Sequence, residues 1–189
     1  YTPDSGAIIQ REIYEKTKGE IDLSTGFTLV VTSLCYQKDD GTYVFHSPYF
    51  GSGSERSGLC MAVDCELLDP TYLRDTVTRM VFSEMAVNRK ECLVAEFNSW
   101  YIGGIAHEMG HLFGLPHDFG RPYEFNPTHL SLMGQYGSRH FNDYLWNGAP
   151  TSVFSAASVM QLMSHPLMTG MTDTEDVQKT FTLTNTTTH

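Results

Sequence analysis

The feature that most constrains this chain of 189 residues is a group of three histidines with fixed spacing, His107, His111 and His117. Residues four positions apart lie on one face of an α-helix, so His107 and His111 can present two imidazoles to one metal ion. Gly114 suits a left-handed helix end, after which the chain can turn sharply and bring His117 back toward that ion. The spacing therefore predicts a helix that ends near Gly114 and carries a site built from three imidazoles.

Glu108 adds a chemical function to this predicted site. Three neutral imidazoles bind zinc and leave a fourth position for water, which distinguishes a catalytic zinc site from a closed structural one. Glu108 follows the first histidine directly and is placed to accept a proton from such a water. The alternative for Glu108 is a solvated helix residue without a chemical role. We favour the catalytic interpretation because the spacings and the turn-compatible glycine all agree.

The segment from His107 to Asp118 resembles the extended zinc-binding motif of the metzincin metallopeptidases, HExxHxxGxxH. This clan also has a tight turn with a methionine beneath the zinc, and Ser131-Leu132-Met133-Gly134 is similar to it. Asp118 is similar to the adamalysin pattern, while Gly110 with Gly114-Leu115 is also similar to the matrixins. The motif therefore indicates the clan and leaves the subfamily unassigned.

The resemblance implies a fold and a role for each motif residue. The implied fold is α+β, with a twisted mixed sheet packed on helices and a zinc cleft between an upper and a lower subdomain. His107, His111 and His117 would bind one Zn²⁺, which acts as a Lewis acid and lowers the pKa of its water. Glu108 would take the water proton and deliver it to the departing amine. Met133 would form an apolar floor beneath the histidines, and Gly114 would support the turn.

Three features depart from the metzincin pattern. A sheet strand precedes the first helix in metzincins, whereas this sequence starts at that helix. The segment from Asp69 to Arg89 has apolar residues at helical spacing and is expected to form an additional helix. Tyr136 lies three residues after Met133, whereas the zinc-binding tyrosine of astacins lies two residues after its methionine. Its role as a transition-state donor is therefore left open.

The rest of the chain predicts mixed helices and strands. Strands are expected where β-branched and aromatic residues gather, with an Asp-Gly turn between the first two and a Gly- and Ser-rich loop before the third. We expect the third of them to be the sheet edge that pairs with an extended peptide. The expected strands are 26–36, 43–46 and 59–65, and the expected helices are 5–18, 69–89, one capped by Asn98 or Ser99, and one starting at 150–152.

Length and charge exclude several classes of protein. The size is that of one domain, so we expect residues 1–169 to form the catalytic domain and 170–189 a Thr-rich tail or the start of a following module. Lys and Arg total 12 against 22 Asp and Glu, which gives a formal charge of -10 and no basic run to bind nucleic acid. No stretch approaches the roughly 20 apolar residues of a transmembrane helix.

The functional hypothesis is a zinc endopeptidase that hydrolyses peptide bonds in extracellular proteins. The four cysteines, Cys35, Cys60, Cys65 and Cys92, permit three pairings and favour an extracellular or periplasmic location. One alternative is a non-catalytic, zinc-containing recognition module of a larger secreted protein, against which the intact Glu108 argues. Another is a zinc hydrolase of a non-peptide amide. The substrate preference and the oligomeric state stay open.

Overall fold

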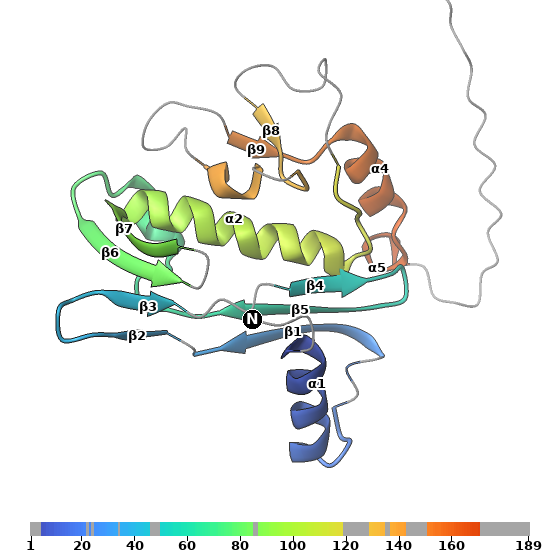
Figure 1. Cartoon of the computed structure of the whole chain (residues 1–189). Helices are drawn as coiled ribbons and strands as arrows, with labels where there is room; N and C mark the ends of the chain where they lie inside the picture. Colours follow the sequence, from blue (N-terminus) through green and yellow to red (C-terminus); the bar gives the residue numbers. More distant parts are fainter. Residues whose placement is uncertain are drawn as a thin grey trace, which may run out of the picture.

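The computed structural model describes residues 5–21, 23, 25–33, 35–45, 50–84, 87–118, 129–134, 137–142 and 151–170, which form a mixed α+β fold. The long helix α2 (Val94–Leu112) lies between the sheet that contains the first strand of the chain and a layer of short C-terminal elements (Figure 1). The elements in chain order are α1 (Ser5–Lys16), β1 (Gly26–Thr32), β2 (Cys35–Gln37), β3 (Tyr43–Phe45), β4 (Phe50–Gly53), β5 (Ser57–Val63), a 3₁₀ helix (Pro70–Arg74), β6 (Arg79–Glu84), β7 (Val87–Leu93), α2 (Val94–Leu112), β8 (His129–Ser131), a 3₁₀ helix (Gly137–His140), β9 (Thr151–Val153), α4 (Ala156–Ser164) and α5 (Pro166–Thr169).

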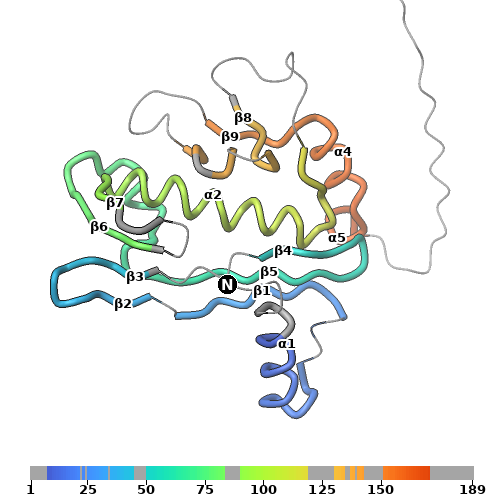
Figure 2. The backbone as a smooth tube through the Cα atoms, viewed as in Figure 1, coloured from blue at the N-terminus to red at the C-terminus, as the bar shows by residue number. Residues whose placement is uncertain are grey.

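The strands form a mixed arrangement of open sheets. In the first sheet, of order β1-β5-β4, β5 is central, with β1 parallel and β4 antiparallel to it. The second sheet has the order β2-β3-β6-β7, and β8 pairs with β9 in parallel. The trace in Figure 2 shows α1 and α2 on opposite sides of the first sheet. None of the described helices is long and apolar enough to cross a membrane.

Helix α2 packs unusually close to β4 and β5 because glycines face it. A Cβ atom at Gly51 would lie 2.0 Å from the backbone oxygen of Glu108. At Gly53 and Gly58 a Cβ atom would lie 1.9 and 2.0 Å from the backbone oxygen of Leu112. Only residues without a side chain permit this approach. The Gly- and Ser-rich segment predicted as a loop thus contains β4, whose glycines set the height of α2 above the sheet.

Replacing Gly51 with alanine should lower the free energy of unfolding by about 1–3 kcal/mol. The new Cβ atom would meet helix backbone, which no side-chain rotation can move aside, so α2 and β4 must separate. Chemical denaturation followed by circular dichroism measures the change. Ser52→Ala is the matched control, because Ser52 is an exposed residue of the same strand and should cost less than about 0.5 kcal/mol. Equal stability of the two variants would contradict the close packing.

The hydrophobic core anchors the first half of α2. The Phe82 ring of β6 contacts Phe97 and Tyr101 of α2 at centroid distances of 5.4 and 5.8 Å, both nearly edge-on. These three side chains are at most 1% exposed. Edge-to-face contacts of this kind favour one relative orientation of the packed rings. The core therefore fixes the position of α2, whose second half carries the histidine motif.

Most of the expected elements are confirmed in the N-terminal part of the chain. The helix expected over 5–18 is α1, which ends at Lys16. The strand expected over 26–36 is divided into β1 and β2, and the strand expected from Tyr43 is β3. Gly41 has a positive φ of 80° in the predicted turn that joins β2 to β3.

The helix predicted over Asp69–Arg89 is wrong. This segment forms a 3₁₀ helix at Pro70–Arg74, then β6 and the start of β7. Val77, one of the apolar residues of this segment, is 85% exposed, whereas Met80 and Phe82 are buried. Alternate residues of a strand point to one face, so the burial of both Met80 and Phe82 fits β6, whereas residues two apart lie on opposite sides of a helix. The turn that begins at Asp75 then interrupts the apparent helical period.

Three other boundaries and placements differ from the predictions. Helix α2 begins at Val94, so Asn98 lies inside it rather than at its cap, and its side chain bonds the backbone of Leu67 and Asp69. The helix expected from 150–152 starts later, at Ala156, after β9. The predicted edge strand, 59–65, corresponds to the central β5, whereas the edges are β1 and β4. The sequence pattern of a buried strand does not reveal which neighbours flank it.

Candidate metal centre

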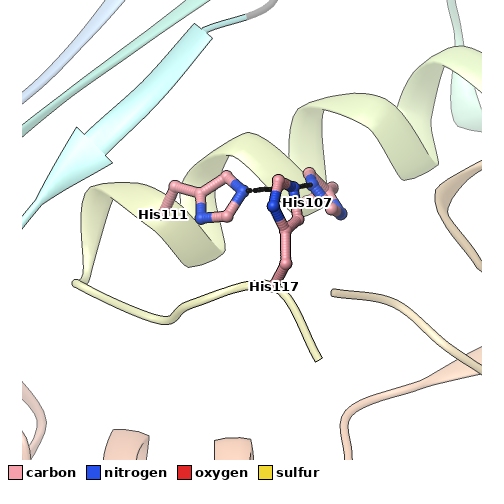
Figure 3. Close-up of side chains that lie close together, drawn as sticks. All are labelled: His107, His111 and His117. Carbon is pink, nitrogen blue, oxygen red and sulfur yellow. Dashed lines mark hydrogen bonds between the residues drawn. The ribbon is translucent and has the colours of Figure 1, made fainter. Parts of the chain in front are cut away.

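The three motif histidines meet at the C-terminal end of α2, as the spacing predicts (Figure 3). The Nε2 atom of His111 lies 3.1 Å from those of His107 and His117, which are 3.2 Å apart from each other. Gly114 has a φ of 78°, and its N–H bonds the His111 carbonyl at 2.9 Å. The left-handed glycine thus ends the helix and returns His117 to the other two imidazoles.

Backbone carbonyls orient two of the three rings. His107 Nδ1 lies 2.6 Å from the Leu132 oxygen, and His111 Nδ1 lies 2.7 Å from the Leu115 oxygen. A carbonyl oxygen only accepts hydrogen bonds, so both Nδ1 atoms carry the proton and both Nε2 atoms offer a lone pair. Such hydrogen bonds fix the tautomer and the ring orientation of metal-binding histidines.

The spacing of the Nε2 atoms fits one metal ion. Unprotonated nitrogens at 3.1–3.2 Å repel one another unless a cation lies between them. Tetrahedral coordination with bonds of 2.0–2.1 Å places nitrogen ligands about 3.3 Å apart. Burial lowers the pKa of His107 and of His111, and the neighbouring imidazoles lower both further, which favours the neutral ligand form. The three residues can therefore hold a metal ion.

Glu108 lies where α2 packs against β4. Burial raises the pKa of its carboxyl group to about 7, although a hydrogen bond from the Gly51 backbone N–H opposes this shift. No positively charged side chain contributes to the shift, so desolvation dominates. The close approach of Gly51 to the backbone of Glu108 makes this contact possible. The carboxyl group of the residue that follows His107 thus has a pKa near neutral pH.

The turn around Met133 lies directly against the motif helix. Met133 is fully buried, and a Cβ atom at Gly110 would lie 2.4 Å from its sulfur atom. The Gly134 N–H bonds the Ser131 oxygen at 3.0 Å and closes the turn, from which Leu132 contacts His107. Gly110 therefore gives Met133 space against the motif helix, and the role of Met133 as an apolar floor beneath the histidines stays a prediction. Tyr136, whose role as a transition-state donor was left open, lies outside the described residues.

Asp118 connects the third histidine to the C-terminal elements. Its carboxylate accepts hydrogen bonds from the hydroxyl groups of Ser131, Ser155 and Ser158, the last two at 2.6 and 3.1 Å. Its N–H also bonds the Met133 oxygen at 3.2 Å. Ser155 caps α4 by accepting from the Ser158 N–H. These serines were not predicted from the sequence, although Ser155 is a typical cap residue before an apolar helix.

The variant Asp118→Ala should lose about 1–3 kcal/mol of stability and about tenfold in metal affinity. The buried hydroxyl groups of Ser155 and Ser158 lose their acceptor, and the loop after His117 loses its link to α4. Denaturation and competitive zinc titration measure the two effects. Asp39→Ala, in an exposed turn, should change neither quantity. Unchanged zinc affinity in Asp118→Ala would show that this link does not hold His117.

Comparisons with known proteins support the fold alone. No family model matches the sequence, and no curated protein matches it. Among solved structures, the crystal structure of wild-type OgpA from Akkermansia muciniphila is similar, with a TM-score of 0.53 and 21% sequence identity. The match covers 84% of this chain and 38% of that chain, so this chain corresponds to less than half of OgpA. The likeness supports the mixed α+β architecture.

Proposed function

We propose that this protein is a zinc-dependent endopeptidase of the metzincin type, acting on peptide bonds in extracellular or periplasmic proteins. The observation that carries the proposal is the convergence of three Nε2 atoms at 3.1–3.2 Å, on a motif that also supplies Glu108. A set of three neutral imidazoles is the ligand set of catalytic rather than closed structural zinc sites. The Met133 turn beside the same helix supports the metzincin assignment.

In this proposal the three histidines hold the metal ion, and Glu108 transfers the proton. Zinc held by His107, His111 and His117 would supply a Lewis acid that polarises the scissile carbonyl and makes water more acidic. Glu108 accepts the proton of the attacking water and returns it to the amine that leaves, so no net proton is consumed by the side chain. A carboxyl group with a pKa of about 7 suits both steps, since both of its forms are populated near neutral pH.

The strand β4 is our proposed binding edge for substrate. Among the described strands it pairs with β5 alone, so its other side offers backbone groups to an extended peptide. Its residue Gly51 already donates to Glu108, which places this edge beside the proposed general base. An extended substrate along β4 therefore brings a peptide bond close to the motif. This assignment replaces the central strand β5, which has no free edge.

The test is cleavage mapping on a diverse peptide library by mass spectrometry, with zinc-loaded protein beside zinc-loaded Glu108→Ala. Cleavage by the wild-type protein alone supports the endopeptidase and shows its side-chain preference. Absence of cleavage by both, with stoichiometric zinc and a folded chain, contradicts it. A library of non-peptide amides then tests the alternative of a zinc hydrolase that acts on non-peptide amides. Hydrolysis of one of these amides would replace the peptidase assignment.

A further inference from the structure

A pair of cysteines meets where two parallel strands leave the first sheet. Strands β1 and β5 end in register at Thr32 and Val63, and the Asp64 N–H continues the ladder by bonding the Thr32 oxygen at 2.7 Å. Cys65 follows β5 by two residues, and Cys35 opens β2. Cys35 packs against the core cluster that contains Cys65, and both cysteines line the same cavity. The course of the backbone thus brings the two cysteines to the same place in the fold.

The surroundings of Cys65 favour its thiolate. The Cys35 thiol and the Leu67 backbone N–H lower the pKa of Cys65, although burial and the carboxylates of Glu66 and Asp64 oppose this shift. Burial instead raises the pKa of Cys60 to about 12 and of Cys92 to about 11. A thiolate is the reactive form in disulfide exchange. Cys65 is therefore the nucleophilic cysteine of the four, with Cys35 beside it as the second thiol.

This pair opens into a cavity of about 500 Å³, which can admit a small molecule. Both cysteines line it together with Asp64 and Glu66, and the Tyr43 hydroxyl bonds the Glu66 carboxylate at 2.8 Å. Cys35 is half-buried, whereas Cys60 and Cys92 are at most 2% exposed. The two carboxylates favour a neutral or positively charged small molecule over an anionic one.

We propose that Cys35 and Cys65 form a reversible disulfide by exchange with a small, positively charged disulfide that enters this cavity. The Cys65 thiolate attacks one sulfur of the small disulfide. The S–S bond of that molecule breaks, Cys65 forms a mixed disulfide with one half of it, and the other half leaves as a thiolate. That thiolate takes the proton of Cys35, and the Cys35 sulfur then attacks Cys65 and displaces the second thiolate, which takes a proton from water. Two protein thiols are oxidised to one disulfide, and the small disulfide is reduced to two thiols.

The new bond would join the first sheet to the second. Cys65 extends from β5, and Cys35 belongs to β2 at the edge of the other sheet. Closing the loop between them restricts the unfolded chain, so the oxidised protein should melt about 10 °C above the reduced one. Because neither cysteine belongs to the histidine cluster, the proposal stands independently of the peptidase assignment.

The experiment treats the full chain with excess cystamine, a disulfide with two ammonium groups, and maps the products by mass spectrometry. The expected product has lost two hydrogen atoms, gives a peptide that links Cys35 to Cys65, and retains no cysteamine. In Cys35→Ser, Cys65 should keep a cysteamine adduct, because the second thiol is missing. Cys92→Ala is the matched control and should form the same bond as the wild-type chain. Circular dichroism confirms that each variant is folded.

Other products would overturn the proposal. A linkage of Cys65 to Cys92 would show that core packing, not the ends of the parallel strands, selects the partner. A lasting cysteamine adduct on the folded wild-type chain, or free thiols after prolonged incubation, would show that Cys35 and Cys65 do not exchange. The melting temperature is a second readout, since oxidation should raise it in the wild-type chain and leave it unchanged in Cys35→Ser.

Discussion

Replacing Glu108 with glutamine should lower kcat/KM by about 10²–10⁴-fold while zinc stays bound. The amide oxygen can still accept the hydrogen bond from the Gly51 N–H, but the amide cannot accept a proton from water. The fold should not suffer, because burying a neutral amide costs less than burying a carboxylate. Steady-state kinetics on a peptide found by cleavage mapping measure the loss, and elemental analysis measures the zinc.

Glu96→Gln is the matched control for this variant. Glu96 lies at the other end of the same helix, where it forms an ion pair with Lys90. Loss of a partly exposed pair should cost at most about 1 kcal/mol of stability and leave the rate unchanged. If Glu108→Gln cleaved as fast as the wild-type chain, another group would have to accept the proton, and our assignment of Glu108 would be wrong.

The variant His111→Ala should bind zinc about 10²–10³-fold more weakly. Two imidazoles remain, and the Leu115 carbonyl loses the Nδ1–H that it accepts. Zinc content after dialysis against a chelator, together with competitive titration, measures the change. Peptide cleavage should fall to background at zinc concentrations that saturate the wild-type protein.

His165→Ala is the matched control for the loss of zinc. His165 is only 3% exposed and accepts the Leu167 N–H at the start of α5, where its ring contacts Phe27 and Phe113. Its removal should lower stability without lowering the zinc content, because it lies outside the histidine cluster. Stoichiometric zinc in His111→Ala, at the same site, would contradict the ligand assignment.

The wrong prediction at Asp69–Arg89 has a physical cause that applies beyond this protein. A strand places apolar residues at every second position, and a helix places them at every third or fourth. In a stretch of only six or seven residues the two patterns overlap, so the sequence does not decide between them. Pairing with β3 and β7 decided that Arg79–Glu84 is a strand. Strand pairing depends on segments far away in the sequence, which the local pattern does not contain.

The local geometry of the histidine motif was determined by the sequence alone. Helix periodicity places His107 and His111 on one face, and a glycine at positive φ ends the helix, so both effects act within a dozen residues. The predicted convergence with His117 is therefore confirmed, and Met133 packs against Gly110 of α2. The identity of the metal and the reaction stay predictions.

Only the tertiary structure decided which distant groups support this motif. Four features join segments separated by many residues: the serines around Asp118, the Leu132 carbonyl on His107, the edge strand β4, and the proximity of Cys35 to Cys65. The local sequence pattern limits which conformations each segment can adopt. Sheet order and strand register then decide which segments meet, because they depend on the free energy of packing the whole chain.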